Sequence, residues 1–243
     1  GGFSSLQVRL EGEVITLLSG TIPGQGWDRP RKVLAQLRRE QPWIGEQLRG
    51  AGRAIPLRRP YDTLARGNRA ALGDAACQVF SAHGSGVGQG LIAGKILADA
   101  LAGGRGVLGY QVDYQRSHGG VLAAMVWFRR LTHSLRPRQL GELMRAGVMN
   151  PEISRDALLQ RSLDDPPSAA ALASVARGVV RQPRLALKVL LKVLGPTVVR
   201  MGLTRQGYRA YPASGDPADL ARWQRGMRLL GQQPDPITRS QDE

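Results

Sequence analysis

The first forty residues carry a strand pattern followed by a helix pattern. Apolar and polar residues alternate over 6–10, and β-branched and apolar residues follow over 14–18, so a hairpin is predicted over 5–20. Pro30 stands where a helix accepts proline in its first turn. Pro42 ends this helix, because proline lacks the backbone N–H that a helix interior needs.

The middle of the chain predicts a short strand and a helix of small residues. A tight turn at Gly67-Asn68 precedes a strand over 69–72, and a helix follows from 87 to 103. Gly90 and Gly94 are four residues apart and share one face of this helix. That spacing predicts a close approach of another backbone.

The second half of the chain is predicted to be helical. A long helical run covers 107–135, and Gly119-Gly120 in its middle is expected to kink it. Further helices are predicted over 139–147, 168–181 and 218–230, and the last dozen residues are expected to be disordered.

The charge of the chain is strongly positive and uneven. Lys and Arg number 34 against 19 Asp and Glu, a net charge of +15, and residues 129–212 contribute an excess of ten. Two interpretations stay open: an ordinary solvated surface, or a face that attracts anionic groups such as lipid headgroups or phosphate backbones. Aromatic residues make up only 5%, which disfavours base stacking, and nucleic acid is not an expected partner.

Residues 183–203 form the most apolar part of this basic region. Lys188 and Lys192 lie four apart on a helix pattern, and Gly195-Pro196 interrupts it. The segment is too short and too interrupted to predict a helix that spans a membrane. Two interpretations stay open: an amphipathic helix on a membrane surface, or a core helix with two exposed lysines.

Several residue types limit the chemistry. With 243 residues, 42% of them hydrophobic, the chain can bury a real core, and wholesale disorder is excluded. One cysteine, Cys77, excludes an internal disulfide, and three histidines leave little for a metal site, so no metal is expected. Cys77 is interpreted as a small buried residue rather than a redox group, and Trp43 as a packing residue. Arg58 and Arg59 are interpreted as a solvated pair, with binding of an anionic group as the alternative.

Residues 73–88 form the segment with the clearest chemistry. Gly73 permits a tight turn that presents the carboxylate of Asp74. Ten residues later, Gly84-Ser85-Gly86 leads into the helix, whose first backbone N–H groups favour negatively charged or oxygen-rich groups. This pairing suits a cofactor with hydroxyls and phosphates, although a purely structural turn before a loosely packed helix fits the spacing equally.

The same residues resemble a known motif. Gly73-Asp74-Ala75-Ala76, followed by Gly84-Ser85-Gly86-Val87 and the helix of small residues, is similar to the second flavin-contacting motif of FAD-dependent oxidoreductases. The resemblance is closest to the geranylgeranyl reductase family. It covers residues 50–135, and residues 1–50 resemble the substrate-domain sheet more weakly. Ser81-Ala82-His83 stands where the family usually carries a proline.

This resemblance implies an α/β flavoprotein fold, of which the present chain would hold a helix-rich α+β part with a short antiparallel sheet. Asp74 would accept a hydrogen bond from a ribityl hydroxyl of FAD or lie near its diphosphate. The N–H groups around Gly86 and Val87 would face the pyrimidine edge of the flavin. The implied reaction is hydride transfer through FAD to or from a hydrophobic substrate, such as an isoprenoid or another lipid. No catalytic residue is identified.

Members of this family bind the ADP half of FAD with an N-terminal βαβ unit that carries Gly-x-Gly-x-x-Gly, and this unit is not found in the sequence. The chain is therefore interpreted as a C-terminal part whose partner half precedes it, cytoplasmic and held at the membrane surface through 183–203. The alternative is a non-catalytic basic module that binds membranes peripherally or acts as a scaffold. The expected parts are a substrate-sheet domain over 1–60, the end of the FAD-binding domain over 61–135, a helical extension over 136–210 and a polar tail over 211–243.

Overall fold

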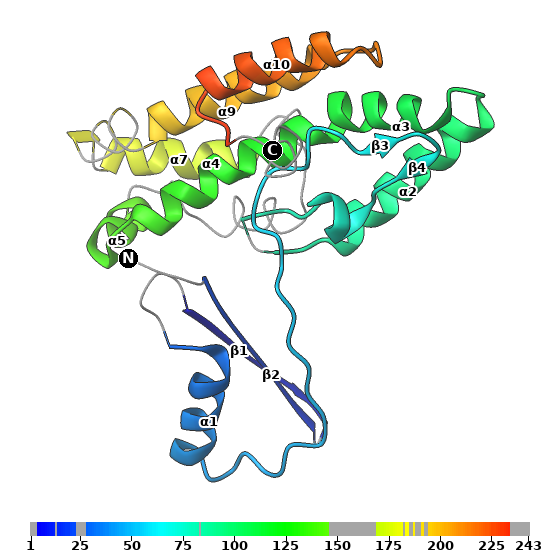
Figure 1. Cartoon of the computed structure of the whole chain (residues 1–243). Helices are drawn as coiled ribbons and strands as arrows, with labels where there is room; N and C mark the ends of the chain where they lie inside the picture. Colours follow the sequence, from blue (N-terminus) through cyan, green and yellow to red (C-terminus); the bar gives the residue numbers. More distant parts are fainter. Residues whose placement is uncertain are drawn as a thin grey trace. The chain divides into compact units, whose positions relative to one another are not determined.

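A computed structural model of the chain shows a helix-rich α+β protein (Figure 1). The described residues are 4–12, 14–22, 28–82, 84–145, 169–181, 183–184, 187, 191 and 194–233. The chain divides into two compact units. Unit 1 comprises Gly1–Ala54 with His133–Arg136, and unit 2 comprises Ile55–Thr132 with Pro137–Glu243.

Unit 1 contains the predicted hairpin and the first helix. Strands β1 (Ser4–Glu11) and β2 (Val14–Thr21) pair antiparallel over their whole length, and Gly12 in the turn takes a positive φ of 61°. Helix α1 (Pro30–Glu40) begins with its proline in the first turn and contacts β2. Both predictions are confirmed. The prediction for Trp43 is wrong, because its side chain is exposed on the segment after α1.

Unit 2 begins with a small hairpin, a turn and a helix. Strands β3 (Ala65–Arg66) and β4 (Arg69–Ala70) flank the predicted Gly67-Asn68 turn, and β4 is shorter than the predicted strand. The short 3-10 helix η1 (Gly73–Ala76) follows. Helix α2 (Val87–Ala102) then runs as predicted up to Gly103. Within the described residues, every paired strand is antiparallel.

The long central helix is divided by a π-helical turn. Helix α3 (Gly106–Tyr114) passes through η2 (Gln115–Gly119) into α4 (Gly120–Ser134). The irregularity lies where the glycine pair predicted a kink. The structure also gives a packing reason for both glycines, because Tyr208 of α9 (Gly195–Arg209) lies against them. A Cβ atom added to Gly119 would lie 3.0 Å from the Tyr208 ring, and one added to Gly120 would lie 2.9 Å from the Tyr208 Cβ.

The remaining helices complete unit 2. They are α5 (Pro137–Arg145), α7 (Ala169–Arg181), α9 (Gly195–Arg209) and α10 (Pro217–Leu229). Gly195-Pro196 therefore begins a helix, as the predicted interruption requires. Asp216 caps α10 by accepting a hydrogen bond from Ala218 N–H at 2.8 Å. Most of the predicted helix over 183–194 and the last ten residues lie outside the described residues.

The core of unit 2 consists of two clusters, one between the turn after β4 and helices α2, α3 and α4, the other between α4, α9 and α10. Buried aromatic side chains dominate it, and their polar atoms are hydrogen-bonded, as burial requires. Trp127 donates to Thr204 at 3.1 Å, and Tyr211 donates to the Asp62 carbonyl at 2.7 Å. Tyr208 packs edge-on against Trp223 with ring centres 5.1 Å apart. Met201 of α9 belongs to the cluster that holds Ala76 and Phe80 of the predicted cofactor segment, whereas Tyr208 and Met227 form the second cluster with Ala123 of α4.

Candidate functional site

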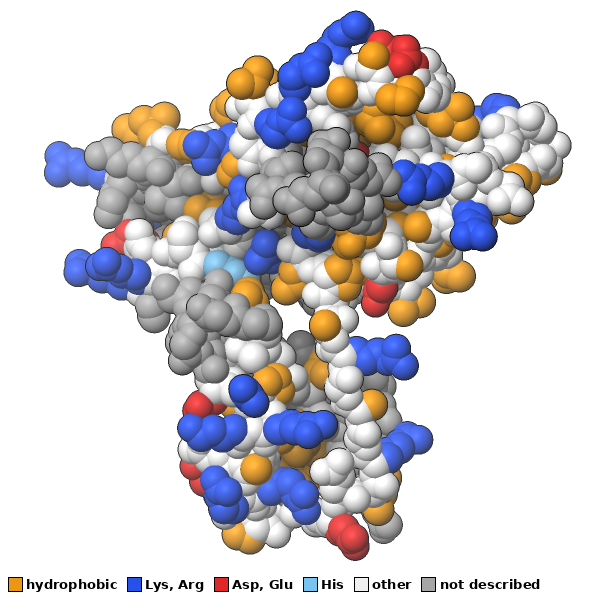
Figure 2. Space-filling model, in the orientation of Figure 1, with side chains coloured by type: hydrophobic (Ala, Val, Ile, Leu, Met, Phe, Trp, Pro, Cys, Tyr) orange, Lys and Arg blue, Asp and Glu red, His pale blue; other side chains and the backbone are white. Residues whose placement is uncertain are grey.

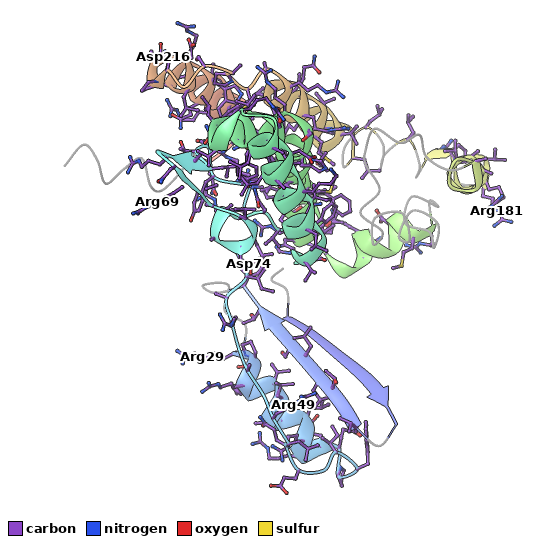
Figure 3. All side chains as sticks on the ribbon, turned by 90° about the vertical axis from the view of Figure 1, so that its right-hand side faces the viewer. Arg29, Arg49, Arg69, Asp74, Arg181 and Asp216 are labelled. Atoms are coloured by element: carbon purple, nitrogen blue, oxygen red, sulfur yellow. The ribbon has the colours of Figure 1, made fainter. Side chains whose placement is uncertain are left out.

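The candidate site begins at the turn that follows β4. Gly73 has a φ of +60°, a left-handed conformation that glycine adopts without a steric penalty. One 3-10 turn then places Asp74 and Ala75 on the surface while Ala76 and Cys77 turn inward. In Figure 3, Asp74 lies at this turn, away from the helical core. The predicted turn with an exposed carboxylate is confirmed.

Two buried side chains hold this turn in place. The Gly73 N–H donates to Oε1 of Gln78 at 2.7 Å, and the Gln78 N–H donates to the Gly73 carbonyl at 2.9 Å. The Gln78 amide donates in turn to the Tyr110 hydroxyl at 2.8 Å, and that hydroxyl donates to the Ala71 carbonyl at 2.9 Å. Helix α3 therefore fixes the turn through Tyr110, and burial raises the pKa of that hydroxyl.

The loop after the turn brings the chain back to Asp74. Phe80 and Ser85 form an antiparallel bridge, in which the Phe80 N–H donates to the Ser85 carbonyl at 2.9 Å. Gly84, with a φ of +79°, reverses the chain between them. A Cβ atom on Gly86 would lie 3.0 Å from Oδ1 of Asp74. The two halves of the motif, ten residues apart in sequence, are therefore in contact.

The N-terminus of α2 is open at this point. Gly86 is its N-cap residue, no side chain accepts a hydrogen bond there, and its first turn carries no acidic residue. The first backbone N–H groups of a helix have no partner within the helix, and the helix dipole makes this end favourable for negative charge. Val87 and Gly88 are exposed. The site thus pairs an accepting carboxylate with a set of backbone donors.

All seven residues predicted for cofactor binding belong to this arrangement. Four lie on the turn or the helix start, and three lie on the returning loop, which is half-buried; the seven are Gly73, Asp74, Ala75, Gly84, Ser85, Gly86 and Val87. His83 lies outside the described residues. Gln78 and Tyr110 were not predicted. A glutamine four residues after an exposed aspartate gives no sign of burial by itself, and Tyr110 is distant in sequence.

The interpretation of Arg58 and Arg59 as a solvated pair is wrong for Arg59. Its guanidinium is buried and bridges both carboxylate oxygens of Asp62. It also donates to the Gln233 carbonyl at 2.7 and 2.9 Å. Burial opposes its charge, but Tyr208 and Asp62 outweigh that effect and raise the pKa of Arg59. This arginine therefore links the segment before β3 to the C-terminal helices and is not available to a ligand.

Cys77 and His118 are enclosed in unit 2 to different degrees. Cys77 is buried, as predicted, and it takes a left-handed φ of 54° at the end of η1. His118 is half-buried and stacks on Tyr114 with ring centres 5.8 Å apart, and burial lowers its pKa. Among the described residues, no three His, Cys, Asp or Glu side chains gather as a metal site would require. Nor does any described helix have the length and hydropathy to cross a bilayer.

Comparisons with known proteins add no family to this description. No protein-family model matches the chain, and a search of curated proteins finds no similar sequence.

Proposed function

We propose that this chain is the C-terminal part of an FAD-dependent oxidoreductase similar to the geranylgeranyl reductases. The observation that supports the proposal most strongly is the contact between Asp74 and Gly86 at the open N-terminus of α2. A bare helix start next to a carboxylate offers donors and an acceptor within a few ångströms of each other. FAD presents both kinds of complementary group, because it carries ribityl hydroxyls and a diphosphate.

In this proposal the chain's own residues bind and orient the cofactor. Asp74 accepts a hydrogen bond from a ribityl hydroxyl, and the backbone N–H groups around Gly86 and Val87 donate to oxygen or nitrogen atoms of the flavin ring. When FAD is bound it supplies the hydride chemistry. The positive end of the α2 dipole favours negative charge at the ring edge beside it. Gln78 and Tyr110 keep the turn rigid, so Asp74 is already positioned before the cofactor arrives.

The proposed substrate is a hydrophobic small molecule such as an isoprenoid or another lipid. The family resemblance supports this choice. The proposal also requires a βαβ unit that binds the ADP half of FAD, so the species to test is the complete protein that contains it.

The test is FAD affinity in the complete protein with Asp74→Ala. Loss of a hydrogen bond to a charged acceptor costs about 1.5–3 kcal/mol, which weakens binding roughly 10- to 150-fold. Asp99→Ala is the matched control, because Asp99 is an exposed carboxylate at the other end of the same helix, paired with Lys95 at 2.7 Å. We expect Asp99→Ala to keep wild-type affinity. Equal affinity of the Asp74 variant and the wild type would remove Asp74 from the site.

A second candidate function is a peripheral membrane module without catalysis. The exposed apolar residues of α9, described below, favour it. The two functions differ in flavin content: a purely membrane-binding module holds no FAD in the complete protein, at any FAD concentration that saturates related sites.

A further inference from the structure

Helix α9 carries apolar side chains both on its buried face and on the side that it exposes. Met201, Thr204 and Tyr208 are buried on the face that packs against η2 and α4. Val199 and Leu203 are 59% and 50% exposed on the opposite side, and Val198, three residues before Met201, is 61% exposed at the edge between the two sides. A surface helix normally carries polar residues on its outer face. The outer face of α9 is therefore not explained by the packing of unit 2.

Exposed apolar side chains also precede α9 in the chain. Leu187 and Leu191 are 58% and 66% exposed, and they precede Gly195 by eight and four residues. Positions four apart lie on one side of a helical segment. Exposed apolar side chains thus recur along the chain from 187 to 203.

The charge around this surface has one sign. From residue 166 to residue 215 the sequence holds no Asp or Glu and eight cations, namely Arg177, Arg181, Arg184, Lys188, Lys192, Arg200, Arg205 and Arg209. Figure 2 shows apolar side chains in orange beside cations in blue in the region that Figure 1 labels α7 and α9. Helix α10 differs, because Asp216 at its N-cap and Asp219 in its first turn accompany its arginines.

We propose that the outer face of α9, with Leu187 and Leu191, binds the surface of a bilayer that contains anionic lipids. A cationic patch alone would suit a nucleic acid, and an apolar patch alone would suit another protein. An apolar face among cations, with no acidic residue in fifty positions, combines the two forces that hold a helix in a lipid interface. The proposal does not depend on the flavin site.

The first test is sedimentation of the protein with vesicles. One set contains phosphatidylcholine alone, and the other contains about one third phosphatidylserine. We expect binding to the anionic vesicles that weakens with added salt. Val199→Glu with Leu203→Glu places two charges on the apolar face and is expected to lower binding by about tenfold or more. Leu229→Glu is the matched control, because Leu229 is 90% exposed on α10, and it is expected to bind as the wild type does.

The second test removes charge and leaves the apolar face intact. Replacing Arg177, Arg181 and Arg184 by glutamine is expected to weaken binding to anionic vesicles by about fivefold for each arginine. Circular dichroism checks that each variant is folded. Three results would overturn the proposal: equal binding to both kinds of vesicle, tighter binding to duplex DNA than to vesicles, or a concentration-dependent dimer that Leu203→Glu abolishes. Flavin content, measured in parallel, reports on the flavin site separately.

Discussion

The buried ion pair between Arg59 and Asp62 is expected to be essential for the stability of unit 2. The two side chains are 4% and 2% exposed, and the guanidinium makes further hydrogen bonds to Tyr208 and to the Gln233 carbonyl. Arg59→Met removes the cation while filling most of its space. The Asp62 carboxylate then stays buried with the Gln224 amide, 3.0 Å away, as a neutral donor.

Removing one partner of a buried ion pair costs about 3–5 kcal/mol of unfolding free energy. Lys95→Met is the matched control, since Lys95 forms an ion pair of 2.7 Å with Asp99 while both side chains are exposed. That exposed pair is expected to contribute less than about 1 kcal/mol.

Urea unfolding followed by circular dichroism measures these differences. The double variant Arg59→Met with Asp62→Leu removes both charges, so we expect it to be more stable than Arg59→Met alone by about 2 kcal/mol or more. The reasoning is refuted if Arg59→Met and Lys95→Met destabilise the protein equally, or if the effects at the two buried positions are additive.

Two other predictions concern the packing of glycines and the titration of tyrosines. Gly120→Ala should destabilise the protein by about 1–3 kcal/mol, because the new Cβ would lie 2.9 Å from the Cβ of Tyr208. Gly94→Ala should instead stabilise it by up to about 1 kcal/mol, because no heavy atom of another described segment lies within 4 Å of the new Cβ. Thermal unfolding compares the two variants, and equal effects would contradict the close approach at Gly120. Burial raises the pKa of Tyr208 from 10.0 to about 12 and also raises that of Tyr110. Because the folded state holds these protons more tightly than the unfolded state, the contribution of these hydroxyls to stability should be complete below pH 10 and should be lost between about pH 10 and about pH 12. Urea midpoints across this range test the sign, and constant midpoints would refute it.

The sequence predicts local structure well where one residue type fixes the backbone. Gly12 and Gly73 take the left-handed conformations that their turns need, and Pro30 begins α1. These features depend on neighbours in the chain, so the sequence pattern reveals them. The contact between Asp74 and the start of α2 was also predictable, because ten residues are enough for one returning loop.

Long-range packing was less predictable. The glycine pair at 119–120 predicted a kink in the helix, but the sequence could not show that Tyr208 lies against both glycines. Gly90 and Gly94 were expected to meet another backbone. A Cβ on Gly90 would lie 4.0 Å from Gly73 Cα, whereas no other described segment lies within 4 Å of a Cβ on Gly94. Small residues on a helix permit close contact without requiring it.

Buried polar residues were the hardest to predict. Arg59 stands in a run of cationic and proline residues that is typical of an exposed segment. Its burial depends on Asp62, three residues later, and on the Gln233 carbonyl, 174 residues later. The bracing of the candidate site by Gln78 and Tyr110 has the same character. Such pairs form only when the fold brings distant segments together, so hydropathy gives no sign of them.

The flavin content of the complete protein decides whether Asp74 and the start of α2 form an FAD site. The protein is expressed from the whole reading frame that contains this chain, saturated with FAD, freed of unbound cofactor and examined by visible absorbance. We predict a flavin spectrum with about one FAD for each chain, as one site built from Asp74 and the start of α2 requires. A colourless protein that circular dichroism shows to be folded would mean that this site does not bind FAD.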